Sequence, residues 1–238
     1  MKTLLIISLA LNALAVAAAL GMWLNRIAIF GSVIHQLRTA AATTFFAVYP
    51  ITPDDIVMVG DSITANGHWA EIFPDVPLKN RGVSADMTTD LLKRLSQVTD
   101  GHPRKAFLLI GTNDIGLGAR WADTLRNYAQ ILDRFIDDTP ETQLYVQSVL
   151  PREAENRDKV LALNVEIMRM AEQRDLTYID LFPAFADEAG VLRDELTYDS
   201  LHLTGEGYRL WHDLIAARVK GADIAPTSVH PGEEVSSP

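Results

Sequence analysis

Residues 56–64 read Ile-Val-Met-Val-Gly-Asp-Ser-Ile-Thr, and this stretch decides the fold class. A short apolar run that ends at a glycine is typical of a strand buried on both faces, as strands are in a parallel sheet. Gly60 permits a tight turn, so Ser62 falls at the carboxyl edge of the sheet. Because active sites of such sheets lie at that edge, Ser62 is the first candidate for chemistry.

The pattern of the first strand repeats along the chain. Further apolar runs, each short enough for a strand, lie at residues 78–80, 106–110, 144–149 and 176–181. Amphipathic helical stretches separate them, at about 86–97, 119–138, 156–174 and 204–219. This alternation predicts an α/β fold over residues 54–220, a three-layer α/β/α sandwich with a five-stranded parallel sheet, of the flavodoxin-like type.

The residues before Asp54 form a different piece, with no acidic side chain. The uncharged run Thr3–Leu24 would span roughly 33 Å as a helix, enough to cross a bilayer. We therefore expect a transmembrane signal anchor at 1–25, an amphipathic or linker segment at 26–53, and an extracytoplasmic catalytic domain in the periplasm or cell envelope. Cleavage of a signal peptide followed by secretion is one alternative, and a buried soluble helix is another.

Composition excludes several classes of protein. Hydrophobic residues make up 48% of the 238-residue chain and charged residues 22%, which excludes a disordered protein, although residues 221–238 resemble a disordered tail. The net charge of −10 argues against a nucleic-acid partner, since phosphate binding needs clustered Lys and Arg. Since the chain has no cysteine, a thiolate nucleophile and Cys-ligated metals are excluded.

A nucleophilic serine needs a base, and His202 is the best candidate. It follows Asp199 by three residues, a spacing that can place a carboxylate against one imidazole nitrogen and leave the other facing the serine. A helix-capping Asp beside a surface His is the simpler alternative. The pair Asp100 and His102 has a similar composition, but it lies on a loop that enters a strand, at the wrong edge of the sheet.

Two further turns offer hydrogen-bond donors at the same edge. Asn113 lies in Gly-Thr-Asn-Asp after the third strand, where its amide can stabilise an oxyanion. Gly82 lies in Asn-Arg-Gly-Val-Ser after the second strand, where the backbone can approach a ligand closely. The turn at Asn113 and Asp114 alone is also explained as an Asn/Asp turn that caps the next helix, a role that suits Asp114 better than Asn113.

Taken in order, these motifs resemble those of the SGNH (GDSL) hydrolase superfamily. The segments Asn-Arg-Gly-Val-Ser-Ala-Asp at 80–86 and Trp-Ala-Glu-Ile-Phe-Pro at 69–74 are similar to the platelet-activating-factor-acetylhydrolase-like branch, although Ala85 stands where Gly is common. The resemblance covers about residues 56–211. It implies roles for the following residues: Ser62 as nucleophile, His202 as general base, Asp199 as the group that orients it, and Ser62, Gly82 and Asn113 as oxyanion donors.

The resemblance implies a serine ester hydrolase that needs neither metal nor cofactor. Because residues 54–219 are close to minimal for such a fold, we expect a short acyl group, above all acetyl, on a sugar or lipid alcohol, with membrane contact through the N-terminal helix. Trp69 and Arg81 are candidates for lining the alcohol side. The alternatives are acyl transfer on the same fold, lysophospholipase or thioesterase activity, and a non-enzymatic envelope scaffold.

Overall fold

The computed structural model describes residues 2–221, which divide into a first unit at residues 2–45 and a second that begins at Phe46. Helix α1 (Lys2–Val48) makes up the first unit and ends in the second. The helix is continuous over the predicted boundary at residues 25–26, and the first helix-breaking proline is Pro50. Apart from Gly221, the predicted tail lies outside the described residues.

The predicted membrane-anchored localisation is wrong. Among residues 2–221, no helix combines the length and apolar character that crossing a bilayer requires. The prediction rested on the uncharged run Thr3–Leu24, and a lack of charge does not by itself establish a membrane span. Secretion after signal cleavage stays an untested prediction.

The second unit contains the predicted five-stranded parallel sheet, in the order β2-β1-β3-β4-β5. Its strands are β1 (Ile56–Gly60), β2 (Leu78–Gly82), β3 (Lys105–Leu109), β4 (Gln143–Gln147) and β5 (Thr177–Ile179). Every residue of β1 and β3 is buried, which explains why these strands, apart from Lys105 at the start of β3, are apolar without alternation. The fold prediction is therefore confirmed.

Helices cover both faces of the sheet, and each face has its own core. One core includes Val57 and Val59 and is covered by α4 (Thr88–Lys93), α5 (Ser96–Thr99), α7 (Trp121–Asp138) and α8 (Arg157–Glu172). The other includes Ile56 and Met58 and is covered by α2 (Ser62–Ala65), α3 (Trp69–Ile72), α9 (Phe182–Phe185) and α10 (Gly205–Val219). Two 3-10 turns, η1 (Ala154–Asn156) and η2 (Asp194–Leu196), complete the connections.

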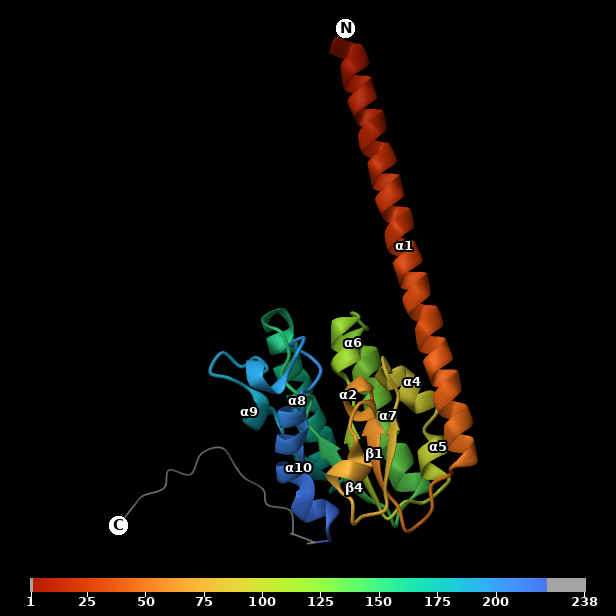
Figure 1. The fold of residues 1–238 in the computed structure, drawn as a ribbon, viewed down its shortest axis with the longest axis vertical. Helices are drawn as coiled ribbons and strands as arrows, with labels where there is room; N and C mark the ends of the chain where they lie inside the picture. The colour runs from red at the N-terminus through yellow and green to blue at the C-terminus, as the bar shows by residue number, and fades with distance from the viewer. Residues whose placement is uncertain (1, 222–238) are drawn as a thin grey trace, which may run out of the picture. The chain divides into compact units, whose positions relative to one another are not determined.

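The strand order brings three loops together. Since β1 lies between β2 and β3, with Gly60 opposite Gly82 on one side and Leu109 on the other, the loops that follow these strands are neighbours. Helices α2 and α6 (Thr112–Gly116) lie at this end of the sheet (Figure 1). The carboxyl edge of the central strands therefore positions the site.

Candidate active site

The nucleophile candidate Ser62 is the first residue of helix α2, immediately after β1. Asp61 caps this helix, because its Oδ1 accepts a hydrogen bond from the Ile63 N–H at 2.9 Å. Gly60 is needed for close packing, since a Cβ there would lie 2.2 Å from the Leu109 carbonyl oxygen. The Ser62 N–H belongs to the first turn, where no helical carbonyl is available to accept it.

A continuous chain of hydrogen bonds joins the three predicted catalytic side chains. Ser62 Oγ lies 2.9 Å from His202 Nε2, and His202 Nδ1 lies 2.7 Å from Asp199 Oδ2. A carboxylate only accepts hydrogen bonds, so the Nδ1–H donates to Asp199 and the unprotonated Nε2 accepts the serine hydroxyl. The imidazole is therefore in the tautomer that a general base requires.

The loop around His202 fixes the position of the Asp199 carboxylate. Its Oδ1 accepts the backbone N–H groups of His202 at 2.7 Å and Leu201 at 3.1 Å. Partial burial alone would raise the pKa of Asp199, but the hydrogen bonds from His202 and Leu201 outweigh it and hold the pKa below its usual value. Asp199 is therefore ionised at neutral pH, and a carboxylate in this position can stabilise an imidazolium at His202.

Besides Ser62, the predicted oxyanion donors are Gly82, the last residue of β2, and Asn113, in the first turn of α6. One hydrogen of the Asn113 amide donates to the Asp86 carbonyl at 2.9 Å, which leaves the other for a ligand. The Gly82 N–H donates to Asn80 Oδ1 at 2.9 Å. A reaction oxyanion would therefore have to share the Gly82 N–H with Asn80 or displace its side chain.

Asn80 also contacts the end of the nucleophile helix. Its Nδ2 lies 3.0 Å from the carbonyl oxygens of Thr64 and Ala65 and 3.2 Å from that of Gly67. These carbonyls close helix α2, so one side chain links the helix that carries Ser62 to the strand that carries Gly82.

Trp69, predicted to line the alcohol side, lies in the core. Its side chain is 2% exposed, and its Nε1–H donates to the Thr64 carbonyl at 2.9 Å. The ring packs edge-on against Trp211 of α10, with ring centroids 4.9 Å apart. Its indole therefore stabilises the packing of α3 on α10 and is not available to a substrate.

Arg81, the other predicted substrate contact, is also 2% exposed. Its guanidinium donates to the backbone carbonyls of Asn80 at 3.0 Å and Tyr49 at 2.5 Å. The same group lies 4.4 Å from the centre of the Phe46 ring, within the range of a cation–π contact. Arg81 therefore ties the end of α1 to β2, and its guanidinium is buried among these contacts.

Sequence reasoning missed a buried ion pair beneath the site. Arg94 Nε donates to Asp86 Oδ2 at 2.6 Å, and Arg94 Nη2 donates to the Gly60 carbonyl at 3.1 Å. The Asp86 carbonyl in turn holds the Asn113 amide. Arg94 thus connects all three loops of the site, although its place in an amphipathic stretch gave no signal of this.

Two more buried carboxyl groups surround this ion pair. Asp114 accepts hydrogen bonds from the N–H of Thr88 at 2.9 Å and from its hydroxyl at 2.6 Å, so the Asn113 loop is tied to α4. Complete burial, with a smaller contribution from Asp86 and Asp114, raises the pKa of Asp61 to about 7. The floor of the site is therefore a dense polar network.

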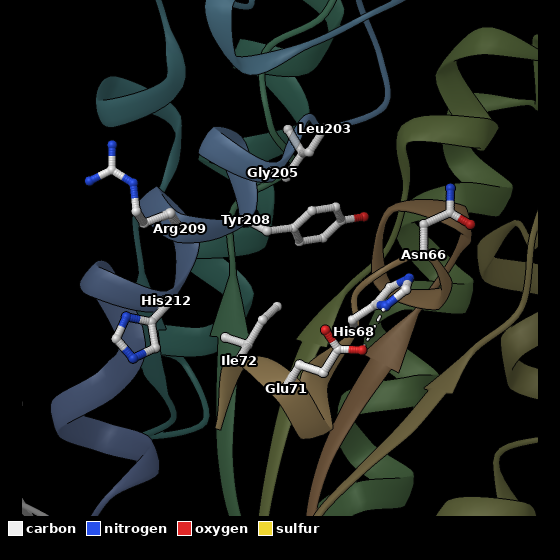
Figure 2. Close-up of a pocket in the computed structure, with 9 residues that line it drawn as sticks. All are labelled: Asn66, His68, Glu71, Ile72, Leu203, Gly205, Tyr208, Arg209 and His212. Atoms are coloured by element: carbon white, nitrogen blue, oxygen red, sulfur yellow. Dashed lines mark hydrogen bonds and ion pairs between the residues drawn. The ribbon is translucent and has the colours of Figure 1, made fainter. Parts of the chain in front are cut away.

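A cavity of about 550 Å³ lies beside the triad, between the α2–α3 segment and α10 (Figure 2). Leu203, which lines it, directly follows His202. Tyr208 extends from α10 toward α2, and its hydroxyl donates to the Ile63 carbonyl at 2.7 Å. The cavity is built from segments far apart in sequence, so no local motif predicted it.

Comparison with known proteins agrees with this geometry. The family model for the GDSL-like Lipase/Acylhydrolase family matches residues 58–210. Platelet-activating factor acetylhydrolase IB subunit alpha1 from Bos taurus is 27% identical over 177 residues, which cover 68% of this chain and 75% of that protein.

Two solved structures share the fold. A GDSL-like lipase from Bacteroides thetaiotaomicron has a TM-score of 0.69 at 22% identity, covering 77% of this chain and 98% of that one. A variant of an acetyl xylan esterase from Geobacillus stearothermophilus has a TM-score of 0.56 at 17% identity, covering 74% and 98%. From the family match and the acetylhydrolase relatives, the chain belongs to the GDSL-like lipase/acylhydrolase family and is a carboxylic ester hydrolase.

Proposed function

We propose that this enzyme hydrolyses short-chain acyl esters, above all O-acetyl esters, through an acyl-enzyme formed on Ser62. The observation that carries the proposal is the hydrogen-bond chain from Ser62 through His202 to Asp199, with distances of 2.9 and 2.7 Å. Nucleophile, base and orienting carboxylate are already within reaction distance of one another.

In the first step Ser62 Oγ attacks the acyl carbonyl while its proton passes to His202 Nε2. The carbonyl oxygen becomes an oxyanion that the N–H groups of Ser62 and Gly82 and the Asn113 amide would stabilise, each donor by about 3–4 kcal/mol. His202 then donates its proton to the alcohol oxygen, and the carbon–oxygen bond breaks. Water repeats the sequence on the acyl-enzyme, which releases the acid and restores Ser62.

Two observations support a short acyl group. In the unit that carries the site, which begins at Phe46, the described residues between the strands form the helices that cover the sheet and the turns that join them, with no separate domain inserted. The acetylhydrolase relatives are named for the removal of acetyl groups, and they match 68% of this chain. A long acyl chain would need a covered apolar channel.

Labelling and turnover test the proposal together. Wild-type protein should react with a fluorophosphonate and cleave p-nitrophenyl acetate, whereas Ser62→Ala should do neither. Ser96→Ala is the matched control, because Ser96 begins α5, which leads into β3 at the opposite edge of the sheet. Retained turnover in Ser62→Ala would overturn the assignment of the nucleophile, and faster cleavage of C10 than C2 esters would overturn the acetyl preference.

A further inference from the structure

The cavity beside the triad has the size and lining of a ligand site. Its volume of about 550 Å³ lies within the range of small-molecule pockets, roughly 300–1,000 Å³. Apolar surface comes from Ile72, Leu203 and Tyr208. Polar side chains surround it, and Figure 2 shows them on both walls: Asn66, His68 and Glu71 on one side, Arg209 and His212 on the other.

The proton path assigns the cavity to one half of the substrate. His202 must give its proton to the leaving alcohol oxygen, so the alcohol has to lie on the His202 side of Ser62. Two residues that line the cavity connect it to this side: Leu203 follows His202, and the Tyr208 hydroxyl donates to the carbonyl of Ile63, next to Ser62. We propose that this cavity is the alcohol subsite, and that its ligand is a neutral polyhydroxylated group of about the size of a pyranose.

The charges in the cavity favour a neutral ligand over an anion. Arg209 of the lining is paired with Glu206 at 2.8 Å, and the carboxylates of Glu71 and Asp213 lie 3.3 Å from His68 Nδ1 and 2.8 Å from His212 Nδ1. A phosphate or carboxylate would have to displace one of these carboxylates, whereas hydroxyl groups can both donate to them and accept from the amide of Asn66. The Tyr208 ring supplies the flat apolar surface on which a sugar ring packs.

Gly205 allows the cavity to be filled without disturbing the fold. It lines the cavity in the first turn of α10, and a Cβ built there meets no atom within 4 Å. A larger side chain at this position therefore meets no backbone obstacle, so Gly205→Trp is the variant chosen to narrow the cavity, and Gly205→Ala is the matched control. Far-ultraviolet circular dichroism and fluorophosphonate labelling of Ser62 show that each variant is folded with a competent nucleophile.

Two acetyl esters separate the alcohol subsite from the chemistry. A mono-O-acetylated methyl pyranoside has an alcohol half that fills the cavity, and ethyl acetate has one too small to enter it. Gly205→Trp is expected to lower kcat/KM for the pyranoside at least about tenfold and to leave that for ethyl acetate within about twofold. Glu71→Gln and Asn66→Ala are expected to raise KM for the pyranoside alone, and free methyl pyranoside should inhibit wild type but not Gly205→Trp.

The inference rests on the proposed function, and the two fail differently. Wild type that neither labels nor cleaves ethyl acetate would overturn both. The alcohol subsite alone would be overturned if wild type cleaves ethyl acetate but Gly205→Trp changes kcat/KM equally for the two esters, or for neither. A preference for an acetylated glycerophosphocholine over the pyranoside, lost in Gly205→Trp, would overturn the neutral ligand.

Discussion

Replacing Asp199 with asparagine should keep the shape of the triad and abolish its function. Asp199 accepts three hydrogen bonds, two at Oδ1 from the backbone N–H groups of Leu201 and His202 and one at Oδ2 from His202 Nδ1. The asparagine carbonyl can retain both backbone bonds. Its amide nitrogen then faces Nδ1 as a donor, so the imidazole proton moves to Nε2 and His202 can no longer accept the proton of Ser62.

The expected loss is large for catalysis and small for stability. The wrong tautomer lowers kcat by about 10⁴, which corresponds to about 5.5 kcal/mol of transition-state stabilisation. The Asp199 side chain is 40% exposed, so losing its ion pair with His202 should cost less than about 1 kcal/mol of folding free energy.

Steady-state hydrolysis of p-nitrophenyl acetate and urea denaturation measure the two effects. Asp199→Ala is the companion variant, since it removes the backbone hydrogen bonds as well and should be less stable than Asp199→Asn. A fall in kcat of less than about tenfold in a folded Asp199→Asn would refute the tautomer argument. Unfolding of that variant would show that the carboxylate is structural.

Three further changes test the surroundings of the triad. Asn113→Ala should lower kcat about 10²–10³-fold with little change in KM, because it removes one oxyanion donor. Arg94→Met should lower the urea-derived free energy of unfolding by about 3–5 kcal/mol, since it leaves the buried Asp86 carboxylate without its guanidinium. Burial raises the pKa of Asp61 to about 7, so only the folded protein holds this proton between about pH 4 and 7, and the stabilising contribution falls as pH rises through that window. Asp61→Asn should reduce this pH dependence by up to about 1.4 kcal/mol per pH unit and still accept the Ile63 N–H.

Each of these predictions has a contradicting result. For Arg94, the matched control is Arg126→Met, because Arg126 pairs with Asp123 on the exposed side of α7 and should matter by less than about 1 kcal/mol. Equal losses in the two arginine variants would contradict the role of the buried pair. A wild-type kcat in Asn113→Ala would contradict the role of Asn113 as an oxyanion donor. Identical slopes of unfolding free energy against pH for wild type and Asp61→Asn would contradict the titration of Asp61.

The fold was readable from the sequence because burial dictates residue type there. The run Ile56–Val59 is wholly buried between two layers of helices, and its composition reflects that environment. On α7, Tyr128, Ile131 and Phe135 are buried as their helical spacing predicts. Ser62 was predicted for a related reason, since the carboxyl ends of parallel strands meet at one edge of the sheet, whereas His202 was predicted from its spacing to Asp199.

What the sequence could not supply depends on contacts between distant segments. Trp69 is drawn into the core by Trp211, more than a hundred residues away, and nothing around Trp69 signals this. Arg94 lies in an amphipathic stretch, where a charged side chain is expected to face solvent. Its buried contacts with Asp86 and the Gly60 carbonyl form only in the folded protein. The cavity between the α2–α3 segment and α10 is likewise a product of tertiary packing, so it leaves no local pattern.

The contacts of Asn80 have a consequence for protein engineering. The Asn80 side chain donates to carbonyls at the end of α2 and accepts the N–H of Gly82. The Gly-Asp-Ser segment at 60–62 and the end of β2 at 80–82 are therefore held in one fixed arrangement. Grafting the serine loop alone onto another parallel sheet would transfer the nucleophile without the geometry that surrounds it. A successful transplant, or a library meant to reshape this enzyme, has to carry or randomise positions 60–67 and 80–82 as one cassette.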